Sequence, residues 1–370
     1  MSEKGADFLN PYKKPEFLQL VVALELVLLA AFLFCLTPVG RSLQTVAPAE
    51  QEEQKKYIKW VDFTVTKDAM YKAFRYDVDT CQKELHLNWI QLLAYLGAKY
   101  GGDFSKYRAS DMETLVSELQ DGQTMEELTK DMKYYSYYLE AYTAVLGGMV
   151  GEFEIQVPKE ENSNEKDPEK VWVRKYGLKA FSPIAKYFPY EDYDDFGASR
   201  SYGYKRQHLG HDMMGQVGTP IIAVESGYVE AIGWNQYGGW RLGTEFINRL
   251  SDMGIRSFDK KRYYYYAHLR KNYPYHKSLK EGSVVQAGDV IGYMGRTGYS
   301  QTENTNNIEV SHLHFGLQLI FDESQKEGNN EIWIDCYELV KFLELNRSET
   351  VKDQETKEYN RVYEMRESGT

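Results

Sequence analysis

The sequence predicts an α+β protein in three parts: an N-terminal transmembrane helix, a helical domain and an all-β antiparallel domain. Three observations lead to this prediction. An uninterrupted apolar run lies near the N-terminus, apolar residues recur at helical spacing within residues 50–155, and short strands separated by glycine-containing turns follow residue 179. With 370 residues, the chain is long enough for two domains or one large one.

Charge and cysteine content narrow the classes of partner and site. The chain carries 55 acidic and 44 basic side chains, a net charge of −11, and this disfavours nucleic acid and anionic lipid surfaces as partners. Cysteine occurs only at Cys35, Cys81 and Cys336, without a C-x-x-C pair. This spacing excludes a cysteine-based zinc site and disfavours a disulfide scaffold, and it leaves a single Cys81–Cys336 bridge open beside two buried thiols.

The apolar segment Phe17–Leu36 has the ~20 residues that a helix needs to cross a bilayer. Glu25 is its one charge, which is costly at that depth unless it is protonated or paired. The alternative is a cleaved signal peptide, but the small-x-small run Ala47–Ala49 lies too far beyond the apolar segment for usual cleavage. We therefore expect an uncleaved signal anchor at residues 17–36.

Basic residues around this segment predict its orientation. They precede it at Lys4, Lys13 and Lys14, whereas only Arg41 follows it closely. The positive-inside bias then places residues 1–16 in the cytoplasm and the domains that follow the helix outside it. We expect a single-pass protein of the cell membrane with extracytoplasmic domains.

Residues 50–155 are expected to form a helical domain. Apolar residues recur at helical spacing before a pair of glycines, at Leu85, Trp89, Leu92, Leu93 and Leu96. The runs Ser110–Glu113 and Thr124–Glu127 have the capping-box form S/T-x-x-E. His86 is a lone histidine here and is assigned a structural role. Because no residue set in this part indicates chemistry, docking of a protein partner or covering of a site elsewhere remain its open functions.

The composition changes after the helical domain. Residues 156–178 are polar and charged, which predicts a linker or a mobile loop. Short strands alternate with turns over residues 179–342 and favour an antiparallel all-β domain. The charged tail, residues 343–370, is expected to be helical or frayed.

Two of the seven histidines, His312 and His314, stand in the strand-like run VSHLHFGLQLI. Residues i and i+2 of a strand point to the same face, with Cα atoms ~6.6 Å apart, so both imidazoles share one surface. Leu313 and Phe315 then face apolar packing on the other side. For an H-x-H motif taken alone, a cross-strand polar pair is the alternative to a functional site.

His208 and Asp212 occur in the run QHLGHDMMG, with Gly210 between them. On a straight strand they would lie ~13 Å apart, too far to share an ion. A bend at Gly210 could bring both side chains to one point.

The other histidines of the β domain divide into one candidate and two bystanders. His268 ends the strand-like run YYYYAHL and is expected to share a face with Tyr264 and Tyr266. His211 would point away from a site built at the bend, and His276 stands in a turn-like stretch. We expect neither His211 nor His276 to take part in chemistry.

Histidine, aspartate and histidine together are the ligand type of a catalytic zinc site, in which three protein ligands leave a fourth position open. Imidazole and carboxylate suit Zn²⁺ better than Mg²⁺ or Ca²⁺, which prefer shells made of oxygen alone. The alternative is a structural zinc site closed by a fourth protein ligand, which would have to be His268, His312 or His211.

These residues match the motifs of a known family. H-x-G-x-D at 208–212, Y-x-H-L at 266–269 and H-x-H at 312–314 occur in the order and approximate spacing of the lysostaphin/LytM-type zinc endopeptidases, which the chain resembles over residues 190–340. The resemblance implies a LytM-like peptidase fold for residues 179–342. Residues 240–256 look longer than the family's hairpin needs and are a candidate loop over the cleft.

The resemblance also implies the roles of individual residues. Three of them would bind one Zn²⁺ per chain: His208, Asp212 and His314. His268 and His312 would then be the catalytic histidines beside the water on the metal, one as general base and one contacting the oxyanion. Tyr204 is a weaker candidate for a transition-state stabiliser.

The family cuts peptide bonds in the stems or cross-links of peptidoglycan, so the resemblance implies peptidoglycan as the substrate. The alternative is a non-hydrolytic scaffold or activator of wall enzymes on the same fold, including a role in spore engulfment. Since relatives without hydrolysis usually lack a motif residue and all five are present here, hydrolysis is the preferred reading.

Overall fold

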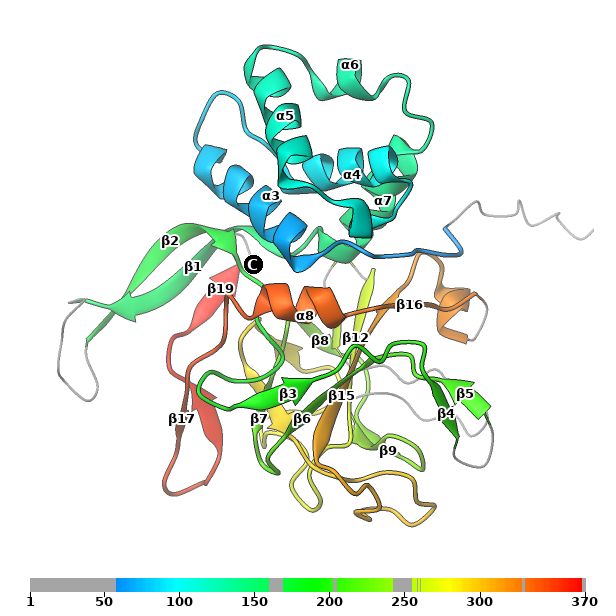
Figure 1. The fold of residues 1–370 in the computed structure, drawn as a ribbon. Helices are drawn as coiled ribbons and strands as arrows, with labels where there is room; N and C mark the ends of the chain where they lie inside the picture. The colour runs from blue at the N-terminus through cyan, green and yellow to red at the C-terminus, as the bar shows by residue number, and fades with distance from the viewer. Residues whose placement is uncertain are drawn as a thin grey trace, which may run out of the picture. The chain divides into compact units, whose positions relative to one another are not determined.

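The computed structural model describes residues 58–159, 169–201, 205–241, 255–257, 259, 261–327 and 330–367. Along the chain, a helical region comes first and a β-rich region follows (Figure 1). The expected cytoplasmic residues 1–16 and the expected transmembrane segment 17–36 lie outside the described residues. Within the part of the chain that is described, no helix has the length and apolar character that crossing a membrane requires.

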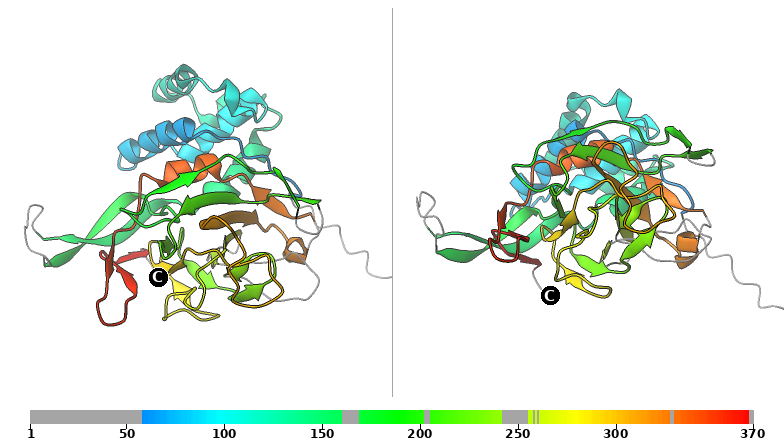
Figure 2. Two further views of the ribbon diagram at one scale, coloured as in Figure 1. Left: turned by 60° about the horizontal axis from the view of Figure 1, so that its bottom comes forward. Right: turned by 90° about the horizontal axis from the view of Figure 1, so that it is seen from below.

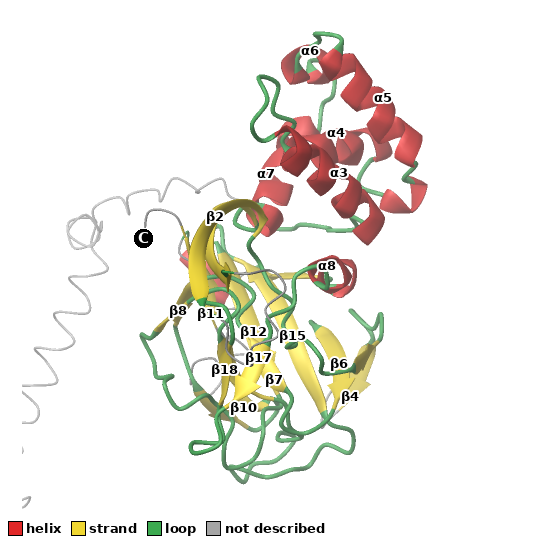
Figure 3. Ribbon diagram, turned by 90° about the vertical axis from the view of Figure 1, so that its left-hand side faces the viewer, coloured by secondary structure: helices red, strands yellow, loops and turns green. Residues whose placement is uncertain are grey.

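The helical region contains α3 (Lys67–Thr80), α4 (Trp89–Tyr100), the 3-10 helix η2 (Phe104–Lys106), α5 (Ala109–Gln120), α6 (Met125–Thr129) and α7 (Tyr135–Leu146). Figure 3 shows these α-helices, in red, packed against one another. The predicted helical repeat is confirmed for four residues, which are buried in α4: Trp89, Leu92, Leu93 and Leu96. Leu85 precedes the helix and is exposed.

Side-chain caps mark where two of these helices begin. Asn88 accepts hydrogen bonds from the N–H groups of Ile90 and Gln91 at the start of α4, which ends at Gly101 in the left-handed conformation. The capping box predicted at Thr124–Glu127 is confirmed. The one predicted at Ser110–Glu113 is wrong, because α5 already begins at Ala109 and Ser110 lies inside the helix.

The β-rich region is built on one antiparallel sheet with the strand order β13-β8-β11-β12-β15-β6-β3, and β16 adds along β15. Its strands are β3 (Tyr190–Asp192), β6 (His211–Gly215), β8 (Gly227–Val229), β11 (Ile255–Ser257), β12 (Arg262–Ala267), β13 (Val284–Val285), β15 (His312–Leu319) and β16 (Ile332–Ile334). Leu313 and Phe315 of β15 are fully buried in the core, as the alternation predicted. Strand β15 therefore presents its histidines on the opposite face.

Short two-stranded ladders surround this sheet. They pair β4 (Ser199–Ser201) with β5 (Lys205–Gln207), β7 (Pro220–Ile222) with β14 (Val290–Tyr293), and β9 (Gly233–Asn235) with β10 (Gly239–Arg241). Helix α8 (Tyr337–Leu343) follows β16 and buries Phe342, whose ring packs against Phe74 of α3.

Two segments that were expected to lack sheet structure form strands. β1 (Val150–Pro158) pairs along its whole length with β2 (Lys170–Leu178), and β19 (Met365–Glu367) pairs with β1. β17 (Thr350–Lys352) pairs with β18 (Tyr359–Arg361). Figure 2 shows these C-terminal strands, in red, beside the β1–β2 hairpin.

The predictions of a linker at 156–178 and of a helical or frayed tail at 343–370 are therefore wrong for the described residues. The charged side chains that suggested them lie on exposed faces, where they pair across strands, as Arg366 does with Glu154. The apolar residues alternate with them, and Phe153 and Met365 are buried. Composition averages over both faces of a strand, so it concealed this alternation.

Arg262, the first residue of β12, joins the sheet to the helical region. Its Nη1 donates to the carbonyl oxygen of Ala144 in α7 at 2.9 Å, and its Nε donates to Glu225 at 2.6 Å. Glu225 also accepts a hydrogen bond from the hydroxyl of Tyr264. A buried ion pair requires such a full set of partners. This network anchors the strand that leads to His268.

The described cysteines do not form the disulfide that the sequence left open. Cys81 and Cys336 are both free. Cys336 is fully buried, and its Sγ lies 3.3 Å from the carbonyl oxygen of Ile334. Burial raises the pKa of the Cys336 thiol. Cys336 is thus a buried thiol, as isolated cysteines commonly are.

Candidate metal centre

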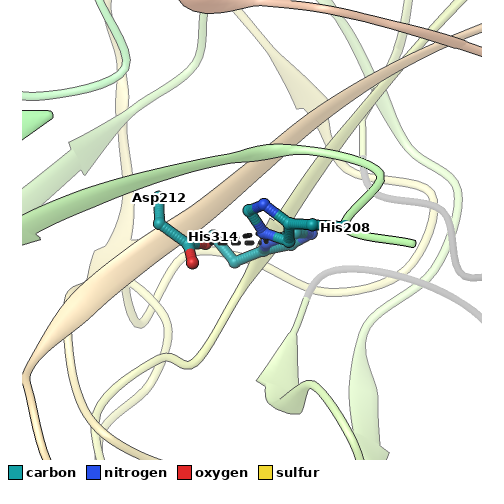
Figure 4. A group of neighbouring side chains, drawn as sticks. All are labelled: His208, Asp212 and His314. Carbon is teal, nitrogen blue, oxygen red and sulfur yellow. Dashed lines mark hydrogen bonds and ion pairs between the residues drawn. The ribbon is translucent and has the colours of Figure 1, made fainter. Parts of the chain in front are cut away.

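Three side chains converge where β6 and β15 pair: His208, Asp212 and His314 (Figure 4). Each offers one ligand atom, and these atoms lie within 4.8 Å of one another. His208 Nε2 is 2.9 Å from His314 Nδ1 and 3.1 Å from Asp212 Oδ1, and His314 Nδ1 is 2.9 Å from the same carboxylate oxygen. The structure brings the predicted ligand set to one point, and its binding of a metal stays a prediction.

Sheet register and one glycine produce this convergence. In the ladder between β6 and β15, His314 stands directly opposite Asp212. The chain bends at Gly210, just before β6, and carries His208 to the same point. A Cβ at position 210 would lie 2.5 Å from Cε1 of His314, so the close approach requires glycine. The predicted bend at Gly210 is confirmed.

The donor chemistry fits Zn²⁺. Zinc binds imidazole nitrogen and carboxylate oxygen at ~2.0–2.2 Å in tetrahedral sites, which sets neighbouring ligand atoms ~3.3 Å apart. The three separations in the structure, 2.9, 2.9 and 3.1 Å, are close to this spacing. His208 Nδ1 lies 3.2 Å from the carbonyl oxygen of Asp195, to which it donates, so its Nε2 lone pair faces the other two groups.

Two further imidazoles, His268 and His312, lie beside this group, with their ring centroids 4.7 Å apart. The centroid of His268 is 5.9 Å from that of His314. His268 Nδ1 lies 2.9 Å from the carbonyl oxygen of Thr297, and His312 Nδ1 lies 2.8 Å from that of Val310. Because a carbonyl oxygen only accepts, both Nδ1 atoms carry a proton, and in the neutral form of each ring Nε2 keeps a lone pair.

His268 reaches the site by a route that strand alternation does not predict. Strand β12 ends just before it, and its φ of 63° lies in the left-handed region. Tyr264 and Tyr266 are fully buried in the core, whereas the rings of Tyr265 and His314 meet in a T-shaped contact, with centroids 5.6 Å apart. The prediction that His268 shares a face with Tyr264 and Tyr266 is wrong, because the backbone changes direction at residue 268.

Burial and neighbouring charges have opposite effects on the pKa values of the side chains in this group. Burial would raise the pKa of Asp212, but hydrogen bonds with His208 and His314 prevail and hold that pKa well below its usual range. Burial lowers the pKa of His268 well below its ordinary value, and burial also lowers the pKa of His314. In His208, the Asp212 carboxylate outweighs burial and raises the pKa. The ionised Asp212 carboxylate and a His314 imidazole that burial favours as neutral are in the state that binds a metal, whereas the raised pKa of His208 means that metal binding must displace its proton.

Two neighbours of the candidate ligand set, Asp195 and Arg200, were not predicted from the sequence. Arg200 Nη2 lies 3.4 Å from Asp212 Oδ2 and also pairs with Asp195, whose backbone carbonyl holds His208. Both residues therefore orient candidate ligands from outside. They precede the motif in a stretch without periodicity, so no local pattern identifies them.

A cavity of 390 Å³ opens over this group, and His208, Asp212, His268 and His314 form part of its wall. Basic and aromatic side chains line most of the remainder: Arg200, Lys205, Arg206, Tyr237, Tyr265, Tyr299 and Trp333. Tyr204, the predicted transition-state stabiliser, lies outside the described residues, so its role stays a prediction.

The two histidines predicted to be bystanders lie elsewhere. His211 is buried, with Nε2 3.5 Å from a carboxylate oxygen of Asp192 and its ring against Tyr337. His276 Nδ1 lies 2.7 Å from the hydroxyl of Ser278 in a turn. Neither lines the cavity over the candidate metal centre.

The segment 240–256, a candidate loop over the cleft, is partly sheet. Its first residues belong to β10, which pairs with β9, and its last residues belong to β11, which pairs with β8 and β12. The residues between these strands lie outside those that the structure describes. The loop prediction is wrong at both ends, because the backbone there completes ladders with neighbouring strands.

Comparison with known proteins identifies the domain that holds these residues. Residues 206–327 match Peptidase family M23. The chain is 34% identical over 122 residues to the L-Ala--D-Glu endopeptidase of Bacillus subtilis (strain 168), a match that covers 33% of this chain and 32% of the relative. It is 33% identical over 108 residues to lysostaphin of Staphylococcus simulans, covering 29% of this chain and 17% of the relative. The chain thus spans a third or less of the length of these curated relatives.

Solved structures of similar proteins include a putative glycyl-glycine endopeptidase lytM from Ruminococcus gnavus, with a TM-score of 0.46 at 20% identity, covering 86% of this chain and 96% of that one. The catalytic domain of lysostaphin from Staphylococcus simulans gives a TM-score of 0.30 at 27% identity, covering 41% of this chain and 92% of that one. The family match and the sequence relatives together show that residues 206–327 of this chain form a Peptidase family M23 domain, homologous to lysostaphin and to the Bacillus subtilis endopeptidase.

Proposed function

We propose that the chain is a membrane-anchored, extracytoplasmic zinc metalloendopeptidase that hydrolyses peptide bonds in the stems or cross-links of peptidoglycan. One observation carries this proposal. Three side chains of zinc-ligand type, His208, Asp212 and His314, meet within 4.8 Å, and two non-ligand imidazoles, His268 and His312, stand beside them. Relatives that bear endopeptidase names support the reaction class.

Zn²⁺ held by His208, Asp212 and His314 would supply a Lewis acid and lower the pKa of a bound water to about 7. The chain's own residues move the proton. His268 and His312 hold their Nδ1–H groups on backbone carbonyls, so either Nε2 lone pair can take a proton from the nucleophile and return it to the leaving amine.

The second histidine of this pair has a different task, which its hydrogen bond constrains. An imidazole whose Nδ1–H is already engaged has no further donor while it is neutral. To stabilise the developing oxyanion it must therefore carry a second proton, at Nε2. His268 and His312 then act in different protonation states, one as the base and the other as the imidazolium donor.

Digestion of cross-linked peptidoglycan tests the proposal. The full chain is expected to contain one zinc ion and to release soluble fragments whose new amine and carboxyl ends are identified by mass spectrometry. The His86→Ala variant is the matched control, since this histidine pairs with Asp77 away from the cavity. Full zinc occupancy without hydrolysis of walls of several chemotypes contradicts the proposal and supports the scaffold alternative.

Anchoring needs its own test. The proposal rests here on the apolar segment Phe17–Leu36 and on the basic residues before it. We expect the full chain to resist carbonate extraction from membranes, and protease added to spheroplasts to digest the M23 domain. Leu28→Arg combined with Leu29→Arg should release the chain from the membrane. Extraction of the unsubstituted chain by carbonate contradicts the anchor.

A further inference from the structure

The cavity over the candidate metal centre has a basic wall that proton transfer does not use. Strands β4 and β5 pair as a short ladder and place Lys205 and Arg206 at the cavity, close in sequence to Arg200. The acidic residues that line the same cavity are Asp212 and Glu331. Basic side chains therefore outnumber acidic ones along the lining, although the whole chain has a net charge of −11.

Most of these charges already have partners. Arg200 pairs with Asp195 and lies 3.4 Å from Asp212, so its charge belongs to the candidate ligand set. Glu331 accepts a hydrogen bond from Trp333 Nε1 at 2.9 Å. Arg206 differs from both, because no carboxylate of the described residues forms an ion pair with it.

Arg206 is nonetheless held in place. Its Nη2 donates to the hydroxyl of Tyr299 at 2.6 Å, and its guanidinium carbon lies 5.5 Å from the centroid of the Tyr299 ring and 5.8 Å from that of Tyr237. Its Nε is buried without a hydrogen-bond partner among the described residues. Its Nη1 group makes no hydrogen bond with the described residues, so the positioned guanidinium keeps N–H donors for a ligand in the cavity.

We propose that Arg206 binds a carboxylate of the substrate peptide, so that the enzyme prefers peptides that carry a free carboxylate in this cavity over neutral ones. The planar guanidinium matches a carboxylate with two parallel N–H donors, which a lysine cannot do. Arg206 is then a specificity-determining residue that takes no part in the proton transfers. This inference rests on the proposed function, because it names the substrate class of the same site.

A pair of peptides that differ in one group tests the inference. The probes are L-Ala-γ-D-Glu-L-Lys-D-Ala with a carboxamide at its C-terminus, whose one free carboxylate is the α-carboxylate of D-Glu, and its twin in which that group is also a carboxamide. The full chain, loaded with Zn²⁺, is compared with Arg206→Gln by titration calorimetry and by kcat/KM. Arg366→Gln is the matched control, since this arginine lies over Trp172, 4.4 Å from the ring centroid, on β19 and away from the cavity.

We expect the unsubstituted chain to favour the acid peptide by ~10- to 100-fold, the effect of a charge-assisted hydrogen-bond pair. Arg206→Gln should abolish this preference while the amide peptide changes less than about threefold, and Arg366→Gln should keep it. Zinc content should be the same in all three proteins, because Arg206 makes no contact with the ligand set.

The outcomes separate this inference from the proposed function. Equal treatment of both peptides by the unsubstituted chain, or a preference that survives Arg206→Gln, overturns the role of Arg206. If the chain hydrolyses neither peptide, only the proposed function is contradicted. The inference is still supported if the chain binds the acid peptide selectively and Arg206→Gln abolishes that selectivity. Binding of neither peptide overturns it.

Discussion

Among the residues that the structure describes, two buried aspartates, Asp77 and Asp212, meet histidine, one in each region, and their surroundings differ. In the helical region, Asp77 accepts hydrogen bonds from the backbone N–H of Trp89 at 2.9 Å and from the hydroxyl of Tyr176 at 2.6 Å, and it lies 2.9 Å from His86 Nε2. Each neighbour can donate to the carboxylate, so the group is complete. The arrangement explains why a lone histidine here is structural.

In the β-rich region, Asp212 faces two imidazoles that also face each other. His208 Nε2 and His314 Nδ1 lie 2.9 Å apart, and each of these ring nitrogens also lies close to the Asp212 carboxylate. Two lone pairs so close repel unless a proton or a cation lies between them. The comparison teaches that a histidine beside an aspartate indicates a metal site only when several lone pairs point at one another.

The largest effect is expected from a substitution that disrupts the group around Asp212 and leaves the group around Asp77 intact. His314→Ala removes a candidate ligand, so zinc affinity should fall by more than about 100-fold, beyond the loss typical of outer-shell partners, and hydrolysis should vanish. Zinc content measured by mass spectrometry checks this. His86→Ala should keep both zinc and activity, and loss of zinc in that variant would contradict the comparison.

The next prediction distinguishes the candidate metal ligands from His268, a neighbouring histidine that is not expected to bind the metal. His268→Ala should lower kcat by ~10²- to 10⁴-fold, the contribution of a positioned acid or base, and leave zinc content unchanged. Steady-state kinetics and metal analysis on the same preparation decide the matter. Zinc loss in this variant would instead make His268 a fourth ligand and support a closed structural site.

Removing the other aspartate should cost stability and spare the metal. Asp77→Ala leaves the Trp89 N–H and the Tyr176 hydroxyl without their acceptor, which should lower the free energy of unfolding by about 3 kcal/mol. Urea denaturation followed by circular dichroism measures the change, and zinc stoichiometry should stay at one. An unfolding free energy within about 0.5 kcal/mol of the unsubstituted chain would show that the group is dispensable.

The smallest effect is expected from a substitution at the Gly210 bend, which brings His208 to Asp212 and which the Asp77 group does not have. Gly210→Ala places a Cβ 2.5 Å from His314 Cε1, and the resulting shift should weaken zinc binding by about tenfold, within the range of overpacking costs. Competition with a chelator measures the affinity. Gly177→Ala is the matched control, because a Cβ there meets nothing within 4 Å and the same affinity should be kept.

Local patterns predicted much of the candidate site. The alternation in β15 put His312 and His314 on one face and Leu313 in the core, and the glycine of the H-x-G-x-D motif marked the bend. Asp195 and Arg200 could not be predicted in this way. Their contacts with the candidate ligands depend on where a loop runs, and no periodicity in their own segment records it.

The fold likewise has elements that local sequence patterns predict and elements that they do not. Helix α4 was predictable because its apolar repeat and the glycine that follows it act over a few residues. Strands β1, β2 and β19 were not, because β19 pairs with a strand about 200 positions earlier in the chain and the charges of all three average to a polar composition. The backbone reversal at His268 was also hidden, since non-glycine residues as a class rarely have a positive φ, although histidine adopts it more often than most.

The sequence by itself determined which side chains could bind a metal and which face of each strand carries them, because ligand chemistry and strand alternation are local properties. Only the tertiary structure decided that His208 and His314, 106 positions apart, meet at one carboxylate. Strand register and a close approach at Gly210 bring them together, and both are set by packing across the whole sheet.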